Sequence, residues 1–166
     1  MAWPKQGRVE DMLDRLTQLG ASAIAQLPCE RAGPYSGELN GPRRERCERV
    51  LREACKQSGR TWLPLLREGP SSKPADFLLL DPCSSVGLAT WIGEIQARGE
   101  AWRWTEERPL CVLVGPEGGF TSAEREGWVA RGALSVRIGP NVLRLETAAE
   151  AALAILAAGF FTPPRT

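Results

Sequence analysis

The chain has 166 residues, 43% hydrophobic and 25% charged, which is the size and composition of one globular domain with a sizeable core. Its formal net charge of +1 does not indicate a partner, although basic residues outnumber acidic ones in the segment 43–60. The chain contains no histidine, which excludes Ser-His-Asp triads, the usual zinc sites and histidine acid–base chemistry.

Five cysteines without a C-x-x-C pair are typical of a protein with reduced thiols. No apolar run approaches the roughly 18 residues that a membrane span needs, and the N-terminus does not resemble a secretory signal. We therefore expect a cytoplasmic protein with no membrane association and no metal site.

Hydrophobic periodicity predicts helices that alternate with short buried strands. The predicted helices are 9–19, 47–55, 86–97, 121–131 and 148–158. The predicted strands are 22–27, 77–80, 110–114 and 134–138. Between them, 34–42 has loop composition, and the stretch from Pro64 to Pro74 is broken by glycine and proline. This alternation predicts an α/β fold with a parallel sheet covered by helices.

Several helix ends carry capping signals. Gly20 is expected to end the first helix, and Thr121 with Glu124 forms a capping-box pattern. A second capping pattern, Thr147 to Glu150, predicts that the last helix starts near Ala148. The chain is interpreted as one domain, 1–166, with a candidate hinge at 68–74 between an N-terminal part (1–67) and a C-terminal part (75–166).

A Gly-Pro-Glu-Gly-Gly loop, Gly115 to Gly119, lies between a predicted strand and a predicted helix. A phosphate-binding P-loop needs lysine after its last glycine, where this chain has Phe120, and no G-x-G-x-x-G fingerprint is present. The loop carries Glu117 and suits an uncharged or zwitterionic ligand. The alternative interpretation is a plain strand-to-helix turn.

A second loop, Ile138 to Ala148, follows the strand 134–138. Glu146 and Thr147 lie near a helix start, where capping alone would explain them. Arg144 is unfavourable there as a cation, so it must pair with an acid or meet an anionic substrate. Because loops that follow neighbouring parallel strands lie side by side, the two loops predict a ligand site held largely by main chain.

These motifs resemble the ribosomal RNA small subunit methyltransferase E family, one of the knotted SPOUT methyltransferases. That family carries G-P-E-G-G followed by L-G-x-x-I-L-R-x-E-T-A, matched here at 115–119 and 138–148. Gln57-Ser58-Gly59-Arg60 matches its Q-S-x-R motif, and Leu19-Gly20 and Glu30-Arg31 match two shorter pairs. The resemblance covers nearly the whole chain.

The resemblance implies a SPOUT-type parallel α/β fold whose C-terminal part forms a trefoil knot. It also implies a homodimer and transfer of a methyl group from S-adenosylmethionine to N3 of a uridine in 16S ribosomal RNA. The cofactor would lie against these residues: Leu80, Val114, Gly115, Pro116, Gly118, Gly119, Ile138, Gly139, Leu143, Glu146 and Thr147.

The resemblance also suggests roles for charged residues. Arg144 is the candidate for stabilising the uridine anion, and Glu117 would bind the cofactor's amine or, less favoured, remove the N3 proton. Arg31 and Arg60 would contact RNA together with Gln57 and Ser58. Alternatively, the two arginines form surface ion pairs, and Gln57 and Ser58 simply end a helix.

Two departures from the family pattern matter. Leu145 replaces the threonine usual between Arg and Glu, and no counterpart of the family's N-terminal PUA-like barrel is found in the sequence. We therefore keep two alternatives open: a non-catalytic RNA- or ribosome-binding module with the same fold and, more distantly, a nucleotide-binding regulatory protein.

Overall fold

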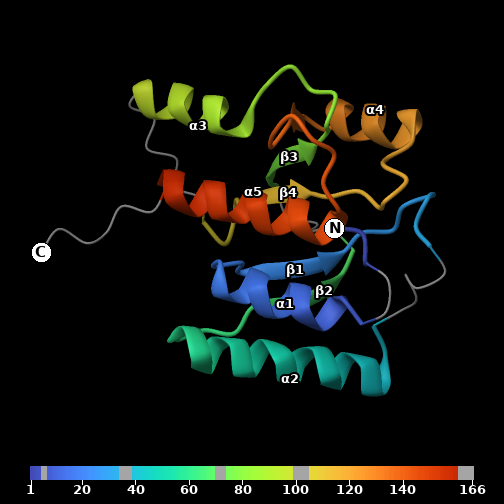
Figure 1. Cartoon of the computed structure of the whole chain (residues 1–166), viewed down its shortest axis with the longest axis vertical. Helices are drawn as coiled ribbons and strands as arrows, with labels where there is room; N and C mark the ends of the chain where they lie inside the picture. Colours follow the sequence, from blue (N-terminus) through green and yellow to red (C-terminus); the bar gives the residue numbers. More distant parts are fainter. Residues whose placement is uncertain (5–6, 34–38, 70–73, 99–104, 161–166) are drawn as a thin grey trace, which may run out of the picture.

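The computed structural model describes residues 1–4, 7–33, 39–69, 74–98 and 105–160, and shows helices alternating with strands (Figure 1). The helices in these ranges are α1 (Val9–Gln18), α2 (Gly41–Ser58), α3 (Leu88–Ala97), α4 (Ser122–Ala130) and α5 (Leu145–Phe160). The strands are β1 (Ala23–Gln26), β2 (Leu65–Glu68), β3 (Asp76–Leu80), β4 (Leu110–Leu113) and β5 (Leu134–Val136). The predicted α/β fold is confirmed.

All described strand pairs are parallel, and they form two sheets. β1 pairs with β2, while β3 lies between β4 and β5. Residues Phe77, Leu78 and Leu79 of β3 are buried, as a strand covered on both faces requires. The register places Leu79 opposite Leu113 on one side and Ser135 on the other.

The first residues of the chain link the two sheets. The backbone N–H of Leu27 donates to the Met1 carbonyl at 2.7 Å, and the N–H of Ala2 donates to the Val114 carbonyl at 2.8 Å. The Met1 amine donates to the carbonyl of Ala25 at 2.8 Å, and its burial lowers the pKa of this amine to about 6. The segment therefore connects β1 with the strand that leads into the glycine-rich loop.

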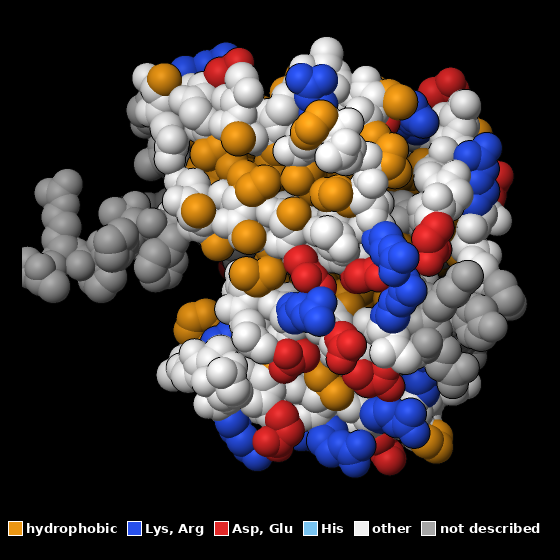
Figure 2. Space-filling view, viewed as in Figure 1, with side chains coloured by type: hydrophobic (Ala, Val, Ile, Leu, Met, Phe, Trp, Pro, Cys, Tyr) orange, Lys and Arg blue, Asp and Glu red, His pale blue; other side chains and the backbone are white. Residues whose placement is uncertain are grey.

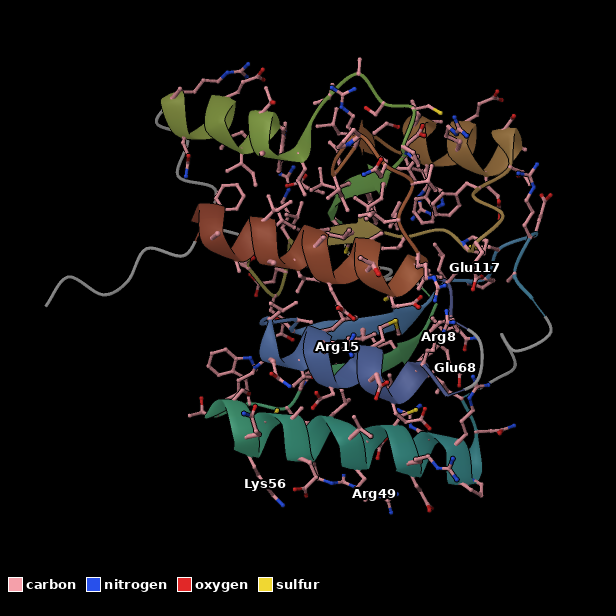
Figure 3. All side chains as sticks on the ribbon, viewed as in Figure 1. Arg8, Arg15, Arg49, Lys56, Glu68 and Glu117 are labelled. Carbon is pink, nitrogen blue, oxygen red and sulfur yellow. The ribbon has the colours of Figure 1, made fainter. Side chains whose placement is uncertain are left out.

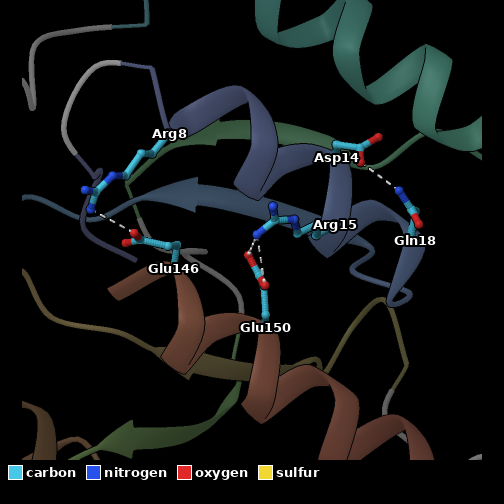
Figure 4. A network of polar contacts seen from close by, with 6 residues as sticks. All are labelled: Arg8, Asp14, Arg15, Gln18, Glu146 and Glu150. Carbon is cyan, nitrogen blue, oxygen red and sulfur yellow. Dashed lines mark hydrogen bonds and ion pairs between the residues drawn. The ribbon is translucent and has the colours of Figure 1, made fainter. Parts of the chain in front are cut away.

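The helices α1 and α5 pack against each other and are joined by two ion pairs (Figure 4). Arg8 contacts Glu146 at 3.0 Å, and Arg15 contacts Glu150 at 3.3 Å. Residues four apart share a helix face, so the two glutamates of α5 reach the same side of α1. These contacts fix the start of α5 against the N-terminal part of the chain.

The structure confirms several predicted helix ends. Thr121 and Glu124 form the predicted capping box of α4. Gly20, directly after the C-cap of α1, has φ +97°, a conformation that favours glycine.

The main differences from the prediction are two helix starts and one strand. The helix start predicted from the capping pattern at 147–150 is wrong, because α5 begins at Leu145 and Thr147 lies inside its first turn. α2 begins at Gly41, where Pro42 suits the first turn of a helix. Strand β2 was missed because its four residues stand between Pro64 and Gly69, which are loop signals.

The candidate hinge at 68–74 and the predicted loop at 34–42 lie partly outside the described residues. Within the described ranges, none of the helices has the length and apolar character that crossing a membrane requires.

Gly159 tests how closely α3 and α5 pack. A Cβ atom at this position would lie 2.6 Å from Cγ2 of the buried Ile92, so Gly159→Ala must displace that side chain. We expect a loss of about 1–3 kcal/mol in the free energy of unfolding, measured by urea titration. Gly93→Ala on α3 is the control, because no atom beyond its chain neighbours and the local helix backbone lies within 4 Å of its Cβ position. Equal effects of the two substitutions would contradict close packing at Gly159.

Candidate functional site

A pocket lies where the chain leaves β3, β4 and β5. Because the three strands are parallel neighbours, their carboxyl ends meet at one edge of the sheet, where open α/β folds bind ligands. The pocket is lined from these loops and from the adjoining starts of α4 and α5: Leu79, Leu80, Asp81, Pro82, Val114, Gly115, Pro116, Glu117, Gly119, Phe120, Arg125, Val136, Arg137, Ile138, Gly139, Asn141, Val142, Leu143, Leu145 and Ala148.

Glycines shape the pocket wall in two different ways. A Cβ atom on Gly115 would lie 3.0 Å from the Phe120 ring and 3.3 Å from the Phe120 nitrogen, so the loop closes on itself there. A Cβ atom on Gly139 would meet nothing within 4 Å. Gly115 therefore allows the turn to form, whereas Gly139 leaves open space beside the pocket.

Charged residues of both signs join this otherwise largely apolar lining. Glu117 is exposed on the loop after β4, and Arg137 is exposed directly after β5. Asp81 and Arg125 form an ion pair at 3.2 Å across the pocket wall. Neither Asp81 nor Arg125 was predicted from the sequence as a site residue. For Asp81 the signal was available, because it directly follows the predicted buried strand 77–80.

Most of the residues predicted to hold a cofactor come together in this pocket. They are Leu80, Val114, Gly115, Pro116, Gly119, Ile138, Gly139 and Leu143. Glu117, predicted to bind the cofactor's amine or to remove the N3 proton, lies among them on the loop after β4 (Figure 3). Gly118, Arg144, Glu146 and Thr147 do not line the pocket.

Gly118 instead contacts Arg31, one of the predicted RNA-binding residues. The Arg31 Nη1 donates to the Gly118 carbonyl at 2.9 Å, and a Cβ atom on Gly118 would lie 3.3 Å from the Arg31 Cβ. The neighbouring Glu30 donates its backbone N–H to Glu124 of α4 at 2.8 Å. The structure thus brings the Glu-Arg pair after β1 to the glycine-rich loop.

Glu146 belongs to the contact between α1 and α5 through its ion pair with Arg8. Its side chain is 14% exposed, and its Oε2 is buried without a partner among the described residues. Thr147 is exposed on the first turn of α5. Their role as cofactor ligands stays a prediction.

Arg144 precedes α5 and is exposed. Its backbone carbonyl accepts the N–H of Ala148 at 2.8 Å, which makes it the residue before the first helical turn. Among the described residues, no carboxylate forms an ion pair with the Arg144 guanidinium. Contact with an anionic substrate, the other predicted role, stays a prediction.

Gln57, Ser58 and Arg60 lie at the opposite edge of the molecule. Figure 3 shows the adjacent Lys56 at the lower left and the loop residue Glu117 at the right, well apart in the view. The Arg60 Nη1 donates to the carbonyls of Thr17 at 2.6 Å and Ala21 at 2.9 Å, which binds the end of α1.

This segment also ends a helix, as one of the alternatives proposed. Ser58 is the last residue of α2, its Oγ donates to the Ala54 carbonyl at 2.7 Å, and Gly59 follows with φ +70°. Within one chain the structure does not bring these residues to the pocket, and their contact with RNA stays a prediction.

The described residues contain no cluster of three or more Cys, Asp or Glu side chains arranged to hold a metal ion. All five cysteines are free, and burial raises the pKa of the Cys29 thiol to about 11.

Comparison with known proteins identifies relatives along almost the whole chain. A family model described as an RNA methyltransferase domain matches residues 1–157. Ribosomal RNA small subunit methyltransferase E of Mycobacterium bovis is 31% identical over 92% of this chain and 59% of its own length. The Synechocystis protein of the same name is 29% identical over 93% of this chain and 50% of its own length. The chain thus spans about half to three-fifths of these relatives.

Solved structures resemble this fold closely. Ribosomal RNA small subunit methyltransferase E from Neisseria gonorrhoeae, bound to S-adenosyl methionine, superposes with a TM-score of 0.73 at 25% identity, over 95% of this chain and 63% of that one. A methyltransferase from Legionella pneumophila in complex with SAM gives 0.71 at 27% identity, over 95% and 64% of the two chains.

Glu124 connects the glycine-rich loop to the segment after β1, and its contribution to stability depends on pH. Partial burial raises the pKa of this carboxyl. Hydrogen bonds from the Thr121 and Glu30 amides lower the pKa by more than burial raises it, so the net pKa lies below the ordinary value. Because the pKa is lower in the folded state, the contact stabilises the fold above the unfolded pKa and is lost as pH falls through the folded pKa.

We expect Glu124→Gln to lower the free energy of unfolding at neutral pH, and the difference from the original chain to shrink as the pH falls below the ordinary glutamate pKa of about 4.3. Urea titrations at a series of pH values measure this difference in the free energy of unfolding. Glu126→Gln, an exposed residue on the same helix, is the matched control and should have little effect at any pH. A difference for Glu124→Gln that is constant with pH would contradict the assignment.

Proposed function

The chain belongs to the RNA methyltransferase domain family, as its motifs predicted, and on this basis we propose that it is an S-adenosylmethionine-dependent RNA methyltransferase. The observation that carries the proposal is the pocket itself, because both predicted motif loops line it. We further propose that the acceptor is N3 of a uridine in 16S ribosomal RNA, in line with the small-subunit enzymes that the chain resembles.

The pocket residues fit the chemistry of this cofactor. Leu80, Val114, Ile138 and Leu143 offer apolar surface and backbone groups to an adenosine. Gly139 leaves room beside them. Side chains of both signs stand at the same pocket, as a zwitterionic amino-acid end requires.

The residues of this chain would contribute positioning and charge. Transfer to an imide nitrogen needs proximity, in-line geometry and loss of the N3 proton, and it needs no metal. When bound, S-adenosylmethionine would supply an electrophilic methyl group, its sulfur would keep the electron pair of the broken carbon–sulfur bond, and the N3 proton would be released to water. Arg144 stabilises the negative charge on the deprotonated uridine, and Glu117 binds the cofactor's amine.

RNA would approach from the side where Arg31 meets the glycine-rich loop. Arg31 uses Nη1 on Gly118 and retains further N–H donors for phosphate or a base edge. Over α2, Figure 2 shows basic side chains interspersed with acidic ones, so this helix presents no uniformly basic face in that view. We therefore place the first contact with RNA at Arg31 and Arg144.

We also propose a homodimer and the trefoil knot that the family resemblance implies. Figure 2 shows hydrophobic side chains gathered between α3 and α5. On α5, Leu153, Ile155 and Leu156 are half-buried, and Ala154 and Ala158 are exposed. A second copy would cover this surface. Sedimentation velocity measures the oligomeric state, and a monomer at micromolar concentration would argue against the dimer.

Cofactor binding is tested by calorimetric titration with S-adenosylmethionine. We expect saturable binding to the original chain and at least about tenfold weaker binding to Gly139→Val, because the valine side chain occupies open space at the pocket. Gly93→Val on α3 is the control, since its Cβ position is equally open but lies outside the pocket. No detectable binding by well-folded original chain would overturn the proposed function.

The role of Arg144 is tested on small ribosomal subunits that lack the methylation. We expect Arg144→Ala to lower turnover by about 100-fold while cofactor affinity stays within about twofold, because the guanidinium meets the substrate rather than the cofactor. Arg98→Ala, an exposed arginine after α3, is the control.

Two results would contradict this assignment. Equal losses of affinity and turnover in Arg144→Ala would mean that the residue holds the cofactor. An original chain that binds cofactor and RNA but turns over no faster than Arg144→Ala would favour the non-catalytic RNA-binding module.

A further inference from the structure

Two opposite charges that no predicted motif contains meet on the pocket wall. Asp81 follows β3 directly, and Arg125 lies on the first turns of α4. The Arg125 Nη1 and the Asp81 Oδ2 are 3.2 Å apart. The Asp81 side chain is 11% exposed and that of Arg125 is 44% exposed. The carboxylate of the pair is therefore largely buried, whereas the guanidinium is accessible to a ligand.

The position of Asp81 is fixed by the sheet and by the turn that follows. Its backbone N–H donates to the Val136 carbonyl of β5 at 2.9 Å. Its Oδ1 accepts the backbone N–H of Cys83 at 2.9 Å, while Oδ2 faces Arg125. Both carboxylate oxygens of Asp81 are therefore engaged within the protein.

Arg125, in contrast, has donors left over. A guanidinium carries five N–H donors, and the contact with Asp81 involves Nη1. In the described part of the chain, Asp81 is its partner. The remaining N–H groups belong to a residue that lines the pocket, and their orientation is restrained by a carboxylate that cannot move away from the end of β3.

We propose that Arg125 binds the carboxylate at the methionine end of the cofactor and that Asp81 is its positioning residue, an inference that rests on the proposed function. A planar guanidinium matches a carboxylate with two parallel hydrogen bonds, which an ammonium cannot do. Glu117 stands at the same pocket and is assigned to the amine. The two residues together match both charges of an amino acid.

Two other interpretations are separated by experiment. Arg137 also lines the pocket, and it could take the carboxylate in place of Arg125. Alternatively, the exposed part of Arg125 contacts an RNA phosphate. We favour the cofactor carboxylate because Arg125 lines the pocket and is held against it by a largely buried acid.

The experiment compares two ligands by calorimetry: S-adenosylmethionine and its decarboxylated form, which keeps the sulfonium and the amine. We expect the original chain to prefer S-adenosylmethionine by roughly 10- to 100-fold, as a charge-assisted bidentate contact implies. Arg125→Ala should bind S-adenosylmethionine more weakly by the same factor and bind the decarboxylated form within about twofold of the original chain, so that the preference disappears.

Further variants separate the recognition role from a structural one. Arg137→Ala is the matched control and should keep the preference. Asp81→Asn keeps an oxygen acceptor for Cys83 but removes the charge that holds Arg125, so the preference should shrink without vanishing. Because Arg125→Ala leaves Asp81 without its partner, Asp81→Asn/Arg125→Met serves as a second test in which neither charge remains. This ratio of two affinities is a readout that a loss of stability alone would not change.

The outcomes are distinct. An original chain that binds neither ligand would overturn the proposed function and this inference with it. Equal affinity of the original chain for the two ligands, or a preference that persists in both Arg125 variants, would overturn the inference alone. Loss of the preference for S-adenosylmethionine in Arg137→Ala, with the preference kept in Arg125→Ala, would also overturn the inference. If Arg125→Ala weakens binding of a short single-stranded RNA but keeps the preference between the two ligands, then Arg125 binds phosphate and the inference fails.

Discussion

The parallel pairing of β3 with both β4 and β5 is the constraint on which the rest of the site depends. Parallel neighbours bring their carboxyl ends to one edge, so the residues after three strands separated by long stretches of sequence meet there. The buried residues of β3 stabilise this arrangement from both faces. If β3 were displaced by one position in register, Asp81 and the two glycine-containing loops would no longer converge.

Around that edge, backbone and side chains contribute different properties. The close approach of Gly115 to Phe120 forms a compact turn, and the fit of Gly118 against Arg31 fastens it to the segment after β1. Glu124 adds a second link, since one carboxylate accepts N–H groups from both Thr121 and Glu30. A loop restrained in this way offers backbone groups at fixed positions, which suits binding of a cofactor largely through main chain.

Arginines serve two purposes in this chain, and the sequence does not distinguish them. Arg60 closes the end of α1 through two carbonyls, and Arg8 neutralises a mostly buried carboxylate on α5. Arg125, in contrast, lines the pocket with donors to spare, and Arg144 is exposed just before α5. The difference between a structural and a functional arginine therefore depends on which acceptors the fold brings within reach.

The sequence by itself determined the apolar stripes of the helices, four of the five described strands, the capping box at Thr121 and the two loops that line the pocket. Each of these is a property of residues close together in the chain, where periodicity and turn chemistry act. The tertiary structure alone decided the pairing order of the strands, the strand β2, the early start of α5 and the meeting of Asp81 with Arg125. These depend on contacts between segments far apart in sequence, whose energy arises only once the chain path brings them together.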